Sequence, residues 1–128
     1  MEYLTLDDIL NIRNQISAVA NDHFEIMSSN ALMSALAAPR RSAFGAEAFP
    51  SLVEKAGALV YSLIQNHPFW DGNKRIATAA LRLFLERNNA QLATDERRLK
   101  GFTIAIASGR LRDQALVAWL RERIEEQA

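Results

Sequence analysis

Two stretches of the chain have apolar residues at the spacing of an α-helix, and only eleven residues separate them. The stretches contain Leu52, Val53, Ala56, Leu59, Val60, Leu63 and Ile64, and then Ile76, Ala79, Ala80, Leu83 and Phe84. This spacing places the apolar side chains on one face of each helix, and the broad first stripe predicts a central position in the core. Pro68 disfavours a helical conformation at His67. A helical hairpin over residues 51–88 is therefore expected, with its first helix stopping near Asn66 and its second beginning near Asn73.

The rest of the chain is also predicted to be helical, because only five glycines and three prolines interrupt it. Further helices are expected over residues 5–21, 30–38, 92–109 and 113–126. No segment shows the apolar–polar alternation of a strand. The predicted fold class is all-α, with about six helices around the central hairpin. The length fits a single domain spanning residues 1–128.

The outer helices are expected to face the core through residues at helical spacing. These are Leu6, Ile9, Leu10, Ile16 and Val19 in the first helix, Leu32 and Leu36 in the second, Leu99, Phe102, Thr103 and Ile106 in the fifth, and Leu116, Trp119, Leu120 and Ile124 in the sixth. Thr5 and Asp8 form a variant of the capping box at the start of the first helix. Pro39 is expected to end the second helix, and Asn88-Asn89 the fourth.

The composition narrows the classes of function. Acidic and basic residues balance at 15 each, so the net charge gives no reason to bind nucleic acid or an anionic membrane. The chain has no cysteine, which excludes disulfides and thiolate metal sites. Its start, MEYLTLDDIL, is acidic where a secretory signal is basic, and no apolar run is long enough to span a membrane. We expect a cytoplasmic protein without direct nucleic-acid binding.

Residues 39–50, PRRSAFGAEAFP, lack helical periodicity. A connection of this length is at the long end of the usual range, where functional loops concentrate. Arg40, Arg41 and Phe44 give it basic and aromatic character. Two interpretations stay open, which are an ordinary surface crossover and a flap that docks a protein substrate.

The segment between the central helices, HPFWDGNKR at residues 67–75, has an unusual charge pattern. It places Lys74 and Arg75 in the first turn of a helix, where free N–H groups and the helix dipole already supply partial positive charge. Gly72 and Asn73 tolerate dihedral angles that let these N–H groups converge, as they do in phosphate sites. A bound polyphosphate would satisfy the N–H groups, the dipole and both cations together. We therefore expect a phosphate-containing ligand here.

Other residues of the same segment fit such a ligand. Asp71 can supply the single carboxylate that Mg²⁺ takes from a protein when phosphate and water provide its other ligands. His67 can take up a proton near neutral pH, and Phe69 would anchor the loop in the core. Each piece also has a plain structural interpretation: His67 as a helix end, DGN as a turn, the two cations as a solvated face, and Trp70 as a loop residue without a role. The combination within nine residues favours the functional interpretation.

The segment 67–75 resembles the signature of the Fic/Doc family, H-P-F-x-[D/E]-G-N-[G/K]-R, at all nine positions. The similarity to the Doc branch extends from Asn30 to about Leu92. The resemblance implies the Fic/Doc fold, with the motif loop between the two central helices. It also implies that ATP and Mg²⁺ are bound, with His67 as the general base. The implied catalytic residues are His67, Asp71, Lys74 and Arg75, the implied cofactor-binding residues are Phe69, Gly72, Asn73, Lys74 and Arg75, and the implied metal ligand is Asp71.

The eighth motif position bears on which group is transferred. Fic enzymes that attach AMP to proteins mostly have glycine there, whereas Doc-like proteins share the lysine found here as Lys74. Doc-like proteins are kinases that phosphorylate a threonine of elongation factor Tu and arrest translation. The resemblance thus implies phosphoryl transfer from ATP to a Ser/Thr hydroxyl of a translation factor. Gly72 retains the general Fic motif and leaves AMP transfer open, and a third alternative is a non-catalytic helical module that only binds an antitoxin.

The resemblance also implies a partner, because Doc proteins are the toxin half of bacterial or phage toxin–antitoxin pairs. Many Fic proteins instead carry an inhibitory motif, [S/T]-x-x-x-E-[G/N]. No Glu of this chain has Ser or Thr four residues before it. We therefore expect control by a cognate antitoxin, through a segment that folds as a helix into a groove.

Overall fold

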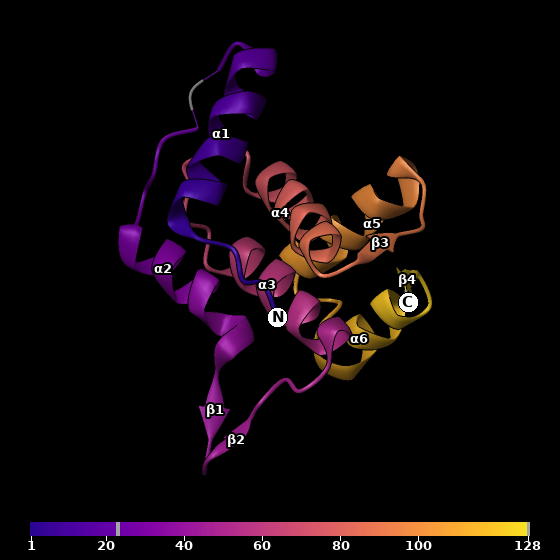
Figure 1. Ribbon diagram of the computed structural model, residues 1–128. Helices are drawn as coiled ribbons and strands as arrows, with labels where there is room; N and C mark the ends of the chain where they lie inside the picture. The colour runs from indigo at the N-terminus through magenta and orange to yellow at the C-terminus, as the bar shows by residue number, and fades with distance from the viewer. Residues whose placement is uncertain (23, 128) are drawn as a thin grey trace.

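Six α-helices make up most of the described chain, which confirms the predicted fold class. The computed structural model describes residues 1–22 and 24–127. The helices are α1 (Leu6–Ala20), α2 (Ser29–Ala37), α3 (Leu52–Gln65), α4 (Asn73–Arg87), α5 (Glu96–Ala107) and α6 (Asp113–Arg121). In Figure 1, α3 lies inside the molecule and the other helices surround it. Helix α4 packs on α3 and α1, while α2, α5 and α6 also contact α3.

The central helices begin and end where the sequence predicts. The Ser51 hydroxyl accepts a hydrogen bond from the Glu54 N–H and so caps the start of α3, whose last residue, Gln65, is followed by Asn66 at the C-cap. After α4, Asn89 adopts a left-handed φ of +59° and turns the chain away. The apolar residues of both stripes are buried or half-buried in one core cluster. No helix in the described chain is long and apolar enough to cross a membrane.

Helix α1 has the predicted capping box. The prediction that all of its spaced apolar residues face the core is wrong for two of them. The Thr5 hydroxyl accepts the Asp8 N–H, and the Asp8 carboxylate accepts the Thr5 N–H. Ile9 is buried, whereas Leu6 and Val19, near the two ends of the helix, are exposed. Figure 1 shows the C-terminal turns of α1 projecting past α4. Spacing alone identifies a face of a helix and does not tell where the covering neighbour stops.

Two small antiparallel sheets were not predicted. Strand β1 (Ser42–Ala43) pairs with β2 (Ala46–Glu47), and β3 (Ala90–Leu92) pairs with β4 (Ile124–Glu126). The sixth helix therefore ends at Arg121, and Ile124 lies half-buried in a strand instead of on a helix. Pairing with β3 satisfies backbone groups that a longer helix would otherwise satisfy. Strands of two or three residues are too short to show alternation in the sequence.

The segment after α2 is an ordered hairpin instead of an irregular crossover. A short 3₁₀ turn (Ala38–Arg40) carries Pro39 and leads into β1. Phe44 and Gly45 both have positive φ values, +54° and +79°, which form the tight turn between β1 and β2. The Phe44 side chain is fully exposed at this turn. Figure 1 shows the hairpin standing away from the helices.

Candidate active site

The motif loop between α3 and α4 is held by a neighbouring segment of backbone. The Met27 N–H donates to the Pro68 carbonyl at 2.8 Å, and the Trp70 N–H donates to the Glu25 carbonyl at 3.0 Å. His67 has a φ of +48°, a left-handed conformation that few non-glycine residues adopt. The backbone hydrogen bonds of Pro68 and Trp70 hold the loop in this conformation. They thereby fix the position of the exposed His67 side chain.

Phe69 and Asn73 fix the loop from inside. The Phe69 side chain is fully buried in the core cluster. The Asn73 side chain accepts the Phe69 N–H at 3.0 Å and donates to the Phe69 carbonyl at 2.8 Å. Because both ends of this amide are bonded to the loop, the Asn73 side chain holds the loop in place, and its backbone N–H can contribute to an anion cradle.

Helix α4 begins without a side-chain cap. Four other helices have such caps, from Thr5, Ser28, Ser51 and Asp95. The residue before α4 is Gly72, which has no side chain to offer and has a left-handed φ of +78°. Its own N–H donates to the Asp71 Oδ1 atom at 2.7 Å. The N–H groups of Asn73, Lys74 and Arg75 have no carbonyl partner one turn back within the helix, so this end of α4 has partial positive charge.

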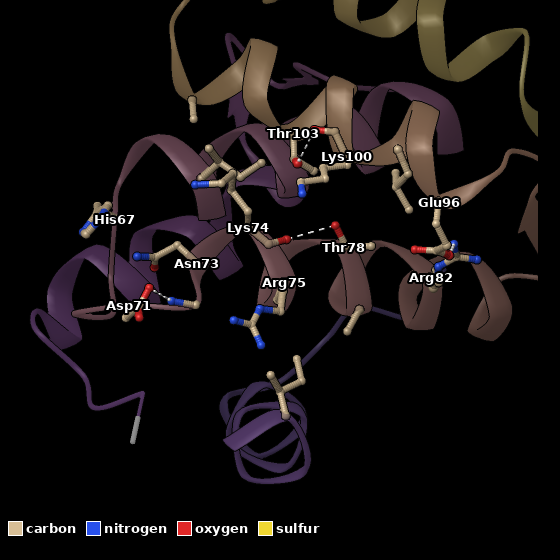
Figure 2. A pocket seen from close by; sticks show the side chains of 16 residues that line it. His67, Asp71, Asn73, Lys74, Arg75, Thr78, Arg82, Glu96, Lys100 and Thr103 are labelled. Atoms are coloured by element: carbon tan, nitrogen blue, oxygen red, sulfur yellow. Dashed lines mark hydrogen bonds and ion pairs between the residues drawn. The ribbon is translucent and has the colours of Figure 1, made fainter. Parts of the chain in front are cut away.

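A pocket of about 780 Å³ opens at this end of α4. Its lining includes the predicted His67, Asp71, Gly72, Asn73, Lys74 and Arg75. Figure 2 shows His67 and Asp71 on the loop side and Lys74 and Arg75 on α4. Phe69 is not among the lining residues, so its effect on the site is through the position of the loop. The structure brings the predicted polar groups together around one cavity.

Phe24 is a site residue that the sequence did not reveal. The Arg75 guanidinium carbon lies 5.3 Å from the centroid of the buried Phe24 ring, which is the geometry of a cation–π contact. The same ring fills the space beside Gly72, where an added Cβ atom would lie 2.5 Å from it. Phe24 thus orients one motif cation and requires glycine at the cap position. Its sequence context, a single aromatic residue outside any helix, offers no signal for either role.

The pocket continues along α4 toward α5. Thr78 and Arg82 follow the motif lysine at intervals of four residues and line the same cavity. Lys100 and Thr103 line it from α5, and Figure 2 shows them facing α4. The ion pair of Arg82 with Glu96, at 2.6 Å, lies at the far end. The four-residue spacing along α4 is a sequence signal that could have identified this extension.

The residues at the motif fit a Mg²⁺ ion that arrives with a nucleotide. Asp71 places a carboxylate in the pocket, with one oxygen already accepting the Gly72 N–H. Residues 1–22 and 24–127 contain no group of three or more His, Cys, Asp or Glu side chains that could hold a metal. Mg²⁺ characteristically keeps several waters and takes its remaining ligands from one or two carboxylates and from phosphate. A lone carboxylate beside a positive helix end meets that requirement.

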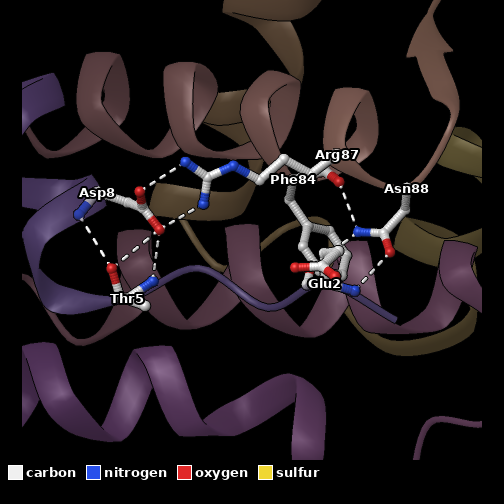
Figure 3. A network of polar contacts seen from close by, with 6 residues as sticks. All are labelled: Glu2, Thr5, Asp8, Phe84, Arg87 and Asn88. Atoms are coloured by element: carbon white, nitrogen blue, oxygen red, sulfur yellow. Dashed lines mark hydrogen bonds and ion pairs between the residues drawn. The ribbon is translucent and has the colours of Figure 1, made fainter.

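The opposite end of α4 is tied to the N-terminal segment (Figure 3). Arg87 donates two hydrogen bonds to the Asp8 carboxylate, at 2.6 and 2.7 Å, and these hydrogen bonds lower the pKa of Asp8 to about 2. The Asn88 side chain accepts the Glu2 N–H and donates to the Glu2 carbonyl. Helix α4 is therefore anchored at its C-terminal end and open at its N-terminal end, where the pocket lies.

The sequence model of the Fic/DOC family matches residues 3–85, which include the whole motif and most of α4. The chain belongs to the Fic/Doc family. It is 39% identical over 94 residues to the protein Toxin Doc of Mycolicibacterium smegmatis, and the matched region covers 73% of this chain and 70% of that protein. These matches confirm the resemblance to the Doc branch that the motif indicated.

Fic/Doc proteins are typically transferases that act on proteins. At the motif, the pocket of this Fic/Doc protein combines the exposed His67 imidazole, the Asp71 carboxylate, the Lys74 and Arg75 cations and an uncapped helix end. The cations and amides can hold phosphate groups, and the imidazole can accept a proton from a hydroxyl at the rim. Positioning and neutralisation of charge are the main demands of group transfer from a nucleoside triphosphate.

Proposed function

We propose that this Fic/Doc protein is the toxin of a toxin–antitoxin pair. In this proposal it transfers a phosphoryl group from ATP to a Ser/Thr hydroxyl of a translation factor and so arrests translation. The observation that carries the proposal is the position of Lys74. Its side chain leaves the uncapped first turn of α4 and lines the same pocket as His67 and Asp71.

The phosphate tail of ATP would bind at the start of α4. The backbone N–H groups of Asn73 and Lys74 would contact its oxygens, and the Lys74 and Arg75 side chains would offset its charge. Phe24 supports this by holding the Arg75 guanidinium beside the cap. Asp71 would hold Mg²⁺, which when bound offsets charge on the phosphate oxygens.

His67 would act on the substrate hydroxyl. As the hydroxyl oxygen forms a bond to the γ-phosphorus, the bond from that phosphorus to the oxygen bridging to the β-phosphate breaks and ADP leaves. The hydroxyl proton passes to a ring nitrogen of His67. The exposure of this imidazole supports the proposal, because a side chain of a folded protein substrate has to reach it from solvent.

AMP transfer is a second candidate, and a specific feature favours it. Gly72 keeps the motif of the Fic enzymes that attach AMP, and the Phe24 ring leaves no room for a larger residue there. The other alternative, a module that only binds an antitoxin, is disfavoured because His67, Asp71 and Arg75 all line one pocket.

Two partners follow from the same proposal. The name Toxin Doc of the relative supports a cognate antitoxin, whose segment would fold as a helix into a groove of this protein. The protein substrate would be elongation factor Tu, docked by the exposed β1–β2 hairpin with Arg40, Arg41 and Phe44. Function inside the cytoplasm would follow from this substrate.

The test is the mass of intact elongation factor Tu after incubation with this protein, ATP and Mg²⁺. A phosphoryl addition is expected, an AMP addition would favour the second candidate, and no addition would contradict enzymatic action on this target. The His67→Ala variant is the matched control. Because the imidazole is exposed, this variant should keep the fold and lose the transfer.

A further inference from the structure

Lys55, in the first half of α3, is almost completely buried, with 1% of its surface exposed. A buried ammonium group is unfavourable unless close hydrogen-bond partners replace the water that it loses. A methionine of similar length would fill the same space without that cost. The charge of Lys55 therefore needs an explanation other than packing.

The contacts of Lys55 join the two ends of the β1–β2 hairpin. The Lys55 Nζ atom donates to the Pro39 carbonyl at 3.2 Å and to the Glu47 Oε1 atom at 2.9 Å. Pro39 lies just before the hairpin, and Glu47 is the last residue of β2. One nitrogen atom on α3 thus binds both the entry and the exit of the hairpin.

The ammonium group stays charged at this position. Burial lowers the pKa of Lys55, but Glu47 and Tyr3 together outweigh burial and raise the pKa above its ordinary value. Two cations contact the Tyr3 ring, with the Lys55 Nζ atom 5.7 Å and the Arg40 guanidinium carbon 5.3 Å from its centroid. The base of the hairpin is therefore fixed to both α3 and the N-terminal segment.

Beyond this base the hairpin has little side-chain support. Its four strand residues are exposed, as is Phe44 at the turn, and Figure 1 shows it standing away from the helices. The hydrogen bond from Arg41 to the Ser34 hydroxyl is long, at 3.5 Å. From Lys55, α3 runs directly toward the motif loop, over about 15 Å to its last residue, Gln65.

We propose that Lys55 is a positioning residue for the protein substrate. Its ammonium group fixes the direction of the β1–β2 hairpin relative to α3, and α3 transmits that position as a rigid helix to the loop that carries His67. A target segment docked on the hairpin is thereby placed at a set distance from the imidazole. This inference rests on the proposed function, in which the hairpin docks the substrate.

The first test measures the hairpin without any reaction. Hydrogen exchange of the amides of residues 41–48 is compared in the wild type, Glu47→Ala and Lys55→Met. Glu47→Ala leaves no cavity, because that side chain is 56% exposed, and Lys55→Met keeps the buried volume. Each variant is expected to speed exchange by about tenfold. The double variant should speed it to the same extent, because both substitutions remove the same contact. The control is Glu122→Gln, which removes the charge of a surface carboxylate near Arg123 and should leave this exchange unchanged.

The second test uses elongation factor Tu and Mg-ATP. For Glu47→Ala and Lys55→Met we expect a several-fold higher KM for the protein substrate, with kcat and the KM for ATP unchanged. A merely structural role would lower the amount of active enzyme and leave every KM as it was. Unchanged hydrogen exchange in both variants would show that Lys55 does not hold the hairpin. Faster exchange with an unchanged KM for the protein substrate would overturn the positioning role. If the wild type modifies no protein, the proposed function fails, and the exchange result still decides whether Lys55 holds the hairpin.

Discussion

Phe24 and Gly72 occupy adjoining space beside Arg75, so a change in one residue affects the other. A methyl group on Gly72 would meet the Phe24 ring at 2.5 Å and would also occupy a backbone conformation with φ of +78°. We expect Gly72→Ala to lower the free energy of unfolding by about 2–4 kcal/mol, from overpacking and backbone strain together. In a Phe24→Leu background the additional cost of Gly72→Ala should be smaller, because the smaller side chain can move away.

Gly45 provides the matched control for this prediction. It has nearly the same φ, +79°, and no atom of residues 1–22 or 24–127 lies within 4 Å of an added Cβ. Gly45→Ala should therefore cost only the backbone strain, about 1 kcal/mol. Denaturant unfolding of the four variants and the wild type measures these costs. An equal decrease in the free energy of unfolding for Gly45→Ala and Gly72→Ala would show that contact with Phe24 does not constrain the motif.

Lys74 is predicted to select the transferred group. Replacing it by glycine removes one charge and opens space at the start of α4, which resembles the motif of the AMP-transferring enzymes. We expect Lys74→Gly to shift labelling of the target from γ-labelled toward α-labelled ATP. The measurement compares the two labels on the same protein substrate. An unchanged ratio of labels, with activity retained, would remove Lys74 as the selector.

The residues of the motif could be predicted because their chemistry is local. Nine consecutive positions carry the imidazole, the carboxylate and both cations, and the structure places their polar groups around one pocket. The contribution of Phe24 could not be predicted, since the contact joins residues far apart in the sequence. The hydrogen bonds of the Asn73 side chain to Phe69 could not be predicted either, because an asparagine at this position can bind a ligand or its own loop.

Among the elements, the connection between α1 and α4 makes a pH-dependent contribution to stability. Hydrogen bonds from Arg87 lower the pKa of Asp8 from 3.8 to about 2 in the folded state. Because the folded pKa lies below the unfolded value, this stabilisation is present above about pH 4 and is lost as the pH falls through the folded pKa. Asp8→Asn should lower the free energy of unfolding at pH 7 by about 1–2 kcal/mol, and the loss should shrink in acid.

Asp7→Asn is the control for this pH dependence. It removes a carboxylate from the same first turn of α1, at an exposed position. Denaturant unfolding between pH 2 and pH 7 should give nearly parallel curves for Asp7→Asn and the wild type, whereas the Asp8→Asn curve should converge with that of the wild type at low pH. A constant difference for Asp8→Asn across this range would contradict the role of its ionisation.

The helices were predictable and the strands were not, for a physical reason. Broad apolar stripes, a proline after α3 and capping residues all act over a few residues, so the bounds of α3 and α4 follow from the sequence. The pairing of β3 with β4 joins residues 90–92 to residues 124–126 and depends on where the last helix ends. The β1–β2 hairpin is too short and too exposed to show a pattern.

In the whole molecule, one arrangement places the motif at the pocket. Helix α4 is anchored at its Arg87 end and presents its uncapped start to a pocket lined by the motif. The family match extends over α3 and most of α4, so the part of the chain that carries this arrangement is the part that resembles the family. The single domain over residues 1–128 stays a prediction from the chain length.

The most direct measurement is a titration of the protein with ATP and Mg²⁺, followed by the NMR signals of the backbone amides. Binding of the phosphate tail at the start of α4 should give the largest shifts at Gly72, Asn73, Lys74 and Arg75. The amides at the start of α3, which Ser51 caps, should change little. If ATP binds while the amide signals of residues 72–75 stay unchanged and the largest shifts lie elsewhere, the phosphate tail does not bind at the start of α4.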